Sequence, residues 1–190
     1  MRSIKIEKRK FHFNKNFAHL DGILEKNKVV LAGGALRKII DHKDVTCDYD
    51  IFFLDQSRVD TTLTALNDHG YTKVFECPRG KLHTYIQGSN KIQICSEFFY
   101  QDYETLLKSF DFYACMFLYD GDKMYFYPQS VRDVTRKIVT INRVTYPVAT
   151  MNRLMKYNKK GYYVGDAIKT VLKAYKTQEF TEEEHRFYID

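Results

Sequence analysis

The sequence has no tryptophan, only three prolines, and no apolar run near the ~20 residues that a membrane-spanning helix requires. Its first ten residues are charged, with no apolar segment behind them, which is not typical of a secretory signal. The four cysteines, at positions 47, 77, 95 and 115, form no C-x-x-C pair, so neither a zinc ribbon nor a disulfide framework is indicated. We therefore expect a cytoplasmic protein with no membrane partner.

The composition is that of a soluble globular protein, because 44% of the 190 residues are hydrophobic and 28% are charged. This balance excludes collagen-like and wholly disordered chains. The net charge of +6 is concentrated: residues 129–176 carry eleven Lys or Arg against two Asp. A basic stretch of this kind is compatible with phosphate-bearing partners, and equally with a solvated helix face.

The hydrophobic pattern predicts strands and helices in mixed order, hence an α+β fold with a mixed β-sheet, flanking helices and a small C-terminal helical extension. We expect a catalytic head over residues 1–145 and a basic, neck-like extension over residues 146–190 with an acidic end. The expected strands are 28–32, 48–54, 71–76, 81–87, 91–98, 124–127 and 137–142. The expected helices are 14–24, 35–40, 57–69, 100–110, 147–160 and 165–176.

The segment that carries chemistry runs from the first of these strands to the second. Gly33 and Gly34 follow the first strand, and Asp48 and Asp50 lie on the second. Residues at i and i+2 of a strand share a face, so the two carboxylates should repel each other unless a cation lies between them. Mg²⁺ is commonly bound by one or two carboxylates together with substrate phosphates. Glycine amides at the start of a helix can approach phosphate oxygens, and Arg37 lies one turn further on.

These residues resemble the polymerase-β nucleotidyltransferase superfamily, and within it the head domain of bacterial-type CCA-adding enzymes and poly(A) polymerases. The family signature is a glycine pair, a small residue, an arginine and then an aspartate pair. The matching residues, in order, are Gly33, Gly34, Ala35, Arg37, Asp48 and Asp50. The segments 109–112 and 119–141 resemble later motifs of the family more weakly, so that the resemblance covers roughly residues 29–161.

The resemblance implies a metal-dependent nucleotidyltransferase that moves a nucleoside monophosphate from a triphosphate to an acceptor, an RNA end first of all, and releases pyrophosphate. Asp48 and Asp50 would be catalytic and would hold Mg²⁺ or Mn²⁺. Gly33, Gly34 and Arg37 would bind the phosphates, and Asp111 would lie near the nucleotide sugar. The basic stretch would line the path of a polynucleotide acceptor.

Some positions depart from the family pattern. The superfamily usually supplies a third carboxylate from a later strand, where this chain has Gln93; Glu97, four residues on, is the candidate replacement and the third metal ligand we expect. Ser109 and Phe110 stand where two arginines are usual, and Cys115 stands at the place of an asparagine. Alignment with the family's neck motif puts three unrelated residues at the base-selecting positions, namely Thr145, Tyr146 and Ala149. The sequence therefore does not predict a CCA-adding activity.

Two alternatives stay open. The fold could have lost turnover and serve as a nucleotide-binding or nucleic-acid-binding module, or it could modify a protein hydroxyl. His83 is interpreted as an ordinary strand histidine, and Asp120 and Asp122 as parts of a hairpin turn. The base used, the acceptor and the oligomeric state are not determined by the sequence.

Overall fold

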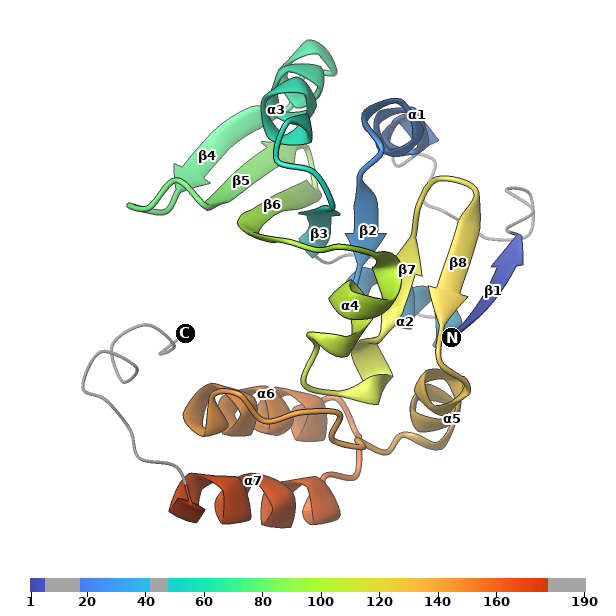
Figure 1. Cartoon of the computed structure of the whole chain (residues 1–190), viewed down its shortest axis with the longest axis vertical. Helices are drawn as coiled ribbons and strands as arrows, with labels where there is room; N and C mark the ends of the chain where they lie inside the picture. Colours follow the sequence, from blue (N-terminus) through green and yellow to red (C-terminus); the bar gives the residue numbers. More distant parts are fainter. Residues whose placement is uncertain (6–17, 42–47, 178–190) are drawn as a thin grey trace.

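The computed structural model describes residues 1–5, 18–41 and 48–177. An eight-stranded sheet forms its centre, with the strand order β1-β8-β7-β2-β3-β6-β5-β4 (Figure 1). The strands are β1 (Arg2–Lys5), β2 (Val30–Ala32), β3 (Asp48–Phe53), β4 (Thr72–Glu76), β5 (Leu82–Gln87), β6 (Asn90–Phe99), β7 (Phe117–Tyr119) and β8 (Lys123–Phe126). The sheet is mixed: β3 and β6 are parallel, and the other paired strands are antiparallel.

Seven helices accompany the sheet in the described part of the chain. They are α1 (Ala18–Asn27), α2 (Gly34–Ile40), α3 (Arg58–Asp68), α4 (Tyr103–Lys108), α5 (Pro128–Arg136), α6 (Pro147–Lys159) and α7 (Gly165–Thr177). None of them, in the part of the chain that the structure describes, is long and apolar enough to cross a bilayer. The α+β class and the mixed sheet with flanking helices are confirmed.

Strand β3 separates two apolar layers, because its side chains alternate between the two faces of the sheet. Tyr49, Ile51 and Phe53 are buried in the larger core, together with apolar residues of α1, α2 and α3. On the opposite face, Leu106 and Leu107 of α4 pack on the ends of β2 and β7. Asp50 is the cross-strand partner of Ala32, a member of this second layer, so Asp48 and Asp50 lie on the α4 face.

The meander expected over residues 71–98 is present as β4, β5 and β6, which are neighbours in the sheet. The prediction of a strand over residues 137–142 is wrong. Only isolated bridges occur there, Phe112↔Ile141 and Ile138↔Tyr163, and Lys137 ends α5 in a left-handed conformation with φ 54°. The four β-favouring residues at 138–141 do not form a strand, because they have no continuous neighbouring strand to pair with.

The C-terminal segment consists of α6 and α7, which contact each other below the sheet in Figure 1. Aromatic residues join α6 to the head: the Phe112 and Tyr157 rings meet edge to face with centroids 5.4 Å apart. Tyr157 also meets Tyr162, beyond the end of α6, at 5.1 Å. A boundary at residue 145 stays a prediction, and both Cys47 and the acidic end of the chain lie outside the described residues.

Candidate functional site: a pocket between the glycine turn and helix α6

The glycine turn connects β2 directly to α2. Gly33 has φ +90°, a left-handed conformation that side chains rarely adopt. A Cβ placed there would lie 3.7 Å from Asp50 Oδ2 and 3.6 Å from the Phe110 ring, so the turn sits directly against the carboxylate. The Gly33 N–H donates to the Phe117 carbonyl at 3.0 Å, which holds the turn to β7. That amide is therefore already engaged in the fold, whereas the sequence suggested that it faces a phosphate.

The two aspartates of β3 share the face that meets this turn. Asp48 is exposed, and its Oδ2 accepts a hydrogen bond from Lys91 Nζ at 3.2 Å. Asp50 is more enclosed: burial, then the nearby charge of Asp48, raises its pKa to about 7, and Lys91 opposes this shift. The raised pKa thus reflects mainly the removal of Asp50 from water, and in addition the nearby negative charge of Asp48, which Lys91 offsets only in part.

The neighbouring strand β6 decides which residue stands beside the aspartate pair. Gln93 is the direct partner of Asp50 in the parallel register, as Lys91 is of Asp48. The register shifts beyond Cys95, so Phe53 pairs with Phe99, and Glu97 falls in the irregular stretch between. Its carboxylate accepts from Lys81 Nζ at 3.1 Å. Within the described ranges, no three His, Cys, Asp or Glu side chains are grouped so that they could hold a metal ion.

A pocket of about 430 Å³ opens beside Asp50. One side is formed by Gly33, Gly34 and Asp50, and a second by residues 109–112 with Cys115. The third side is one face of α6, whose contributing residues are Arg153, Lys156, Tyr157 and Lys160. Carboxylate, glycine turn and helix thus converge on one space, although they are separated by up to 127 positions in the chain.

Asp111 lies in this pocket, as the resemblance suggested, but it is bound to α6. Its Oδ2 accepts hydrogen bonds from Arg153 Nη1 at 2.6 Å and Thr150 Oγ1 at 3.0 Å. The residue is only 9% exposed, and its backbone carbonyl accepts from the Asn142 amide at 2.7 Å. Asp111 therefore anchors the helix to the head. A contact with a nucleotide sugar stays a prediction.

Arg37 is not among the residues that line the pocket. It is 3% exposed, and its guanidinium lies over the rings of Tyr157 and Tyr162, with centroid distances of 5.4 and 5.6 Å. Its Nη1 donates to the Tyr162 hydroxyl at 3.2 Å. The structure thus uses Arg37 to hold α2 against the C-terminal segment, and a role in phosphate binding stays a prediction that this geometry does not favour.

Three cations of the pocket wall could not be distinguished from the other basic residues of the stretch 129–176 by sequence alone. Arg153, Lys156 and Lys160 stand at i, i+3 and i+7, the spacing that places residues on one face of a helix. That spacing was the available signal. The structure shows which way this helix face points, because Tyr157 on the same face is buried against the head and only 9% exposed.

The minor candidates behave as interpreted. The His83 ring is buried in β5, paired with Ile94 and 3.7 Å from Glu76 Oε2. Asp120 Oδ1 accepts from the amides of Asp122 and Lys123, as expected for a hairpin turn.

The Cys115 thiol, at the edge of the pocket, donates to the Phe112 carbonyl, and burial raises its pKa to about 11. At that pKa it is not a thiolate near neutral pH.

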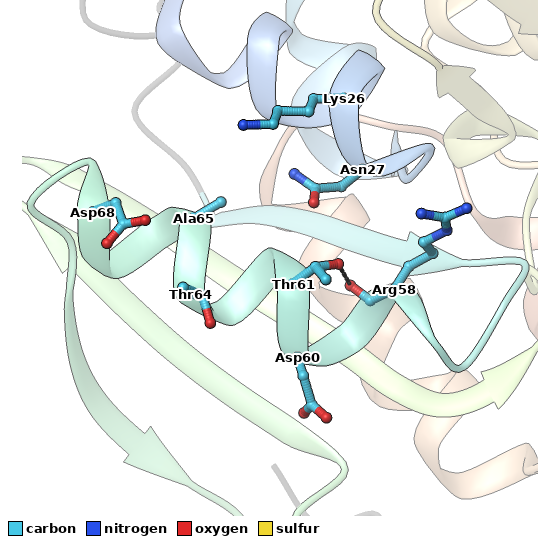
Figure 2. A pocket seen from close by; sticks show the side chains of 8 residues that line it. All are labelled: Lys26, Asn27, Arg58, Asp60, Thr61, Thr64, Ala65 and Asp68. Carbon is cyan, nitrogen blue, oxygen red and sulfur yellow. Dashed lines mark hydrogen bonds between the residues drawn. The ribbon is translucent and has the colours of Figure 1, made fainter.

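A second pocket, of about 500 Å³, lies between α1 and α3 (Figure 2). Its charges are mixed, with Lys26 and Arg58 against Asp60 and Asp68. Figure 2 shows these side chains spread along the two helices, with Thr61 bonded to the Arg58 carbonyl. None of the predicted site residues lines it, so the pocket beside Asp50 is the candidate site.

Solved structures similar to this chain include CCA-adding enzymes and a tRNA-processing enzyme. The Thermotoga maritima CCA-adding enzyme complexed with tRNA has a TM-score of 0.67 at 12% identity, over 92% of this chain and 47% of that one. A CCA-adding enzyme with ATP gives 0.63 at 14% identity, over 83% and 41%. At these identities the likeness shows the fold alone. This fold is of the polymerase-β nucleotidyltransferase type.

A curated relative at 26% identity over 162 residues is Gabija anti-defense 2 of Bacillus phage SPbetaL7. The match covers 81% of this chain and 40% of the relative, so the chain spans less than half the length of that protein. The family model described as Gabija anti-defense 2 family protein matches residues 5–137. The chain therefore belongs to the Gabija anti-defense 2 family.

Proposed function

We propose that this protein is a metal-dependent nucleotidyltransferase that transfers a nucleoside monophosphate from a nucleoside triphosphate to an acceptor, an RNA end first of all. We further propose that this transfer serves the activity for which its relative is named, opposition to the Gabija defence. The observation that carries the proposal is Asp50, with Asp48 on the same strand face, set against the Gly33 turn at a pocket lined with cations.

The donor set fits a hard divalent cation, because two carboxylates share one strand face and the pKa of Asp50 is raised by burial and by Asp48. Asp48 and Asp50 would hold Mg²⁺ or Mn²⁺. Such an ion lowers the pKa of an attacking hydroxyl and neutralises phosphate charge. Lys91 Nζ already contacts Asp48 Oδ2, so its ammonium would compete with the cation for that oxygen.

The remaining residues would position the substrate. The glycine turn lets the α-phosphate approach Asp50 closely, because a side chain at residue 33 would fill the space next to Oδ2. In the reaction the acceptor oxygen bonds to the α-phosphorus while the bond to the bridging oxygen of pyrophosphate breaks, and the hydroxyl proton is released. The protein contributes chiefly by orienting these groups and offsetting their charge.

One observation favours a second candidate, a nucleotide-binding module without turnover. Gln93 stands directly beside Asp50 where a third carboxylate is usual, and Glu97 is paired with Lys81. Under this alternative the pocket binds a triphosphate but releases no pyrophosphate.

The experiment that tests the proposal combines the purified chain, Mg²⁺, labelled nucleoside triphosphates, and either pooled RNA or host protein extract. We expect label on RNA and release of pyrophosphate, with a loss of about 10³-fold in the Asp48→Asn, Asp50→Asn double variant. Label on polypeptide identifies a protein hydroxyl as the acceptor. Triphosphate binding without pyrophosphate release supports the binding module, and equal rates for wild type and double variant exclude the proposed catalysis.

A further inference from the structure

Among the residues that the structure describes, the cations that line the pocket come from one face of α6 and the residue directly after it. They are Arg153, Lys156 and Lys160, whereas residues 109 and 110, which also line the pocket, are uncharged. We propose that this face of α6 binds the phosphate tail of the nucleoside triphosphate. The inference rests on the proposed function and names the part of the site that recognises the substrate's charge.

The three cations differ in what they contact. Arg153 is paired with Asp111, which fixes the guanidinium at one end of the wall. Lys156 makes no ion pair among the residues that the structure describes, and it is exposed at the pocket. Lys160 Nζ lies 5.5 Å from the centroid of the Tyr157 ring. A phosphate tail would bring Lys156 the negative charge that Asp111 already gives Arg153.

Position favours a triphosphate over the backbone of a nucleic acid. These side chains line the same pocket as Gly33, Gly34 and Asp50, and a triphosphate concentrates several negative charges within that short span. The other basic residues of the segment do not line it: Lys159 of α6 and Lys169, Lys173 and Lys176 of α7 are exposed outside the pocket. Those residues remain available for a longer polyanion.

The buried aromatic cluster explains how the wall is held in place. Tyr157 lies between the pocket cations in sequence, and its ring packs on Phe112 and against Arg37. Because Lys156 and Lys160 flank this anchored residue, their positions relative to the glycine turn are set by the fold. A freely moving lysine would lose more side-chain entropy on binding a phosphate.

The test measures the affinity of a non-hydrolysable nucleoside triphosphate in the presence of Mg²⁺. The Lys156→Met, Lys160→Met double variant should weaken binding by roughly 10- to 100-fold, or about 1.4–2.8 kcal/mol in total, because two charge-assisted contacts to phosphate are removed. Binding of the corresponding monophosphate should change far less. The matched control, Lys159→Met with Lys173→Met, removes the same charge outside the pocket and should leave triphosphate affinity within about twofold.

Other outcomes overturn the inference. An unchanged triphosphate affinity in the pocket variant, or an equal loss in the control, shows that this helix face is not the phosphate site. Weakened binding of a short RNA with unaltered triphosphate binding assigns the wall to the acceptor instead.

Failure of the proposed function is distinguishable from failure of the inference. If wild type binds the triphosphate through Lys156 and Lys160 but transfers nothing, the inference holds and the catalytic proposal fails. If wild type transfers and the pocket variant keeps its KM for the triphosphate, the reverse is true. A wild type that binds no triphosphate at all overturns both.

Discussion

The two walls of the pocket differ in how the chain builds them. The acidic wall is local: the glycine turn and the two aspartates come from adjacent strands within residues 33–50, inside the range matched by the family model. The cationic wall comes from α6, beyond residue 137, and reaches the pocket only through long-range contacts. The geometry of the acidic wall, and the chemistry proposed there, thus depend on strand register, whereas the cationic wall and the phosphate binding proposed for it depend on how α6 docks.

The largest effect is expected at the acidic wall, from the cost of ionising Asp50. Its pKa is raised in the folded protein to about 7 from an ordinary value of 3.8. Between these values the folded state holds a proton that the unfolded state has lost, so the free energy of unfolding decreases as the pH rises through this window. Above pH 7 the whole cost is present.

Asp50→Asn should therefore stabilise the metal-free protein at pH 8, by roughly 2–4 kcal/mol at most, and should flatten the pH dependence of unfolding. Urea denaturation of wild type and variant between pH 4 and 8 measures this. Adding Mg²⁺ should stabilise the wild type alone. A parallel pH profile for the two proteins would show that Asp50 ionises at little cost.

The docking of α6 can be broken at Arg37. Replacing it by Met keeps much of the volume but removes the donor to Tyr162 and the cation over both tyrosine rings. We expect the free energy of unfolding to decrease by about 2–3 kcal/mol. Arg136→Met, at an exposed position on α5, should change it by less than about 0.5 kcal/mol.

A second measurement on Arg37→Met separates the two walls. Triphosphate affinity should fall because α6 is loosened, whereas Mg²⁺ binding at Asp48 and Asp50 should be retained. Loss of metal binding with intact triphosphate binding would instead show that Arg37 stabilises the acidic wall.

Gln93, on the strand next to the aspartate pair, offers a test of the acidic wall. The register puts this side chain directly beside Asp50, so Gln93→Glu would supply a third carboxylate on the same face. We expect Mg²⁺ affinity to rise about tenfold, measured by calorimetry, because a further anionic oxygen joins the site. Glu97→Gln is the control and should have little effect, since Glu97 is paired with Lys81. A clear loss of Mg²⁺ affinity in Glu97→Gln would restore the third-ligand role that the sequence suggested.

The same contrast explains which features were predictable from the sequence. Alternation along one strand places Asp48 and Asp50 together, and a glycine pair after β2 indicates the tight turn, because both rules act within a few residues. Arg37 could not be assigned in this way, since its hydrogen-bond partner Tyr162 lies 125 residues further on. The place of Glu97 relative to the aspartate pair could not be derived from the sequence, because strict alternation does not hold across a register shift that only the paired strands reveal; its role as a third metal ligand stays a prediction.

The smallest effect concerns Lys91, the one basic residue that contacts the aspartate pair in the described part of the chain. Its ammonium competes with a metal ion for Asp48, but it also lowers the pKa of Asp50 and so helps to keep the pair ionised. Lys91→Met should raise the pKa of Asp50 further in the metal-free protein. At pH 9, well above the pKa of about 7 for Asp50, competition should dominate, and Mg²⁺ affinity should rise about two- to fivefold. At pH 6 the gain in Mg²⁺ affinity should be smaller, because most Asp50 carboxyls are then protonated and the ion must displace that proton. Lys73→Met is the control. It removes a similarly exposed lysine from its ion pair with Glu76 on β4 and should leave Mg²⁺ affinity unchanged at both pH values. A pH-independent gain at Lys91 would mean that the lysine acts through Asp48 alone and that protonation of Asp50 does not limit metal binding.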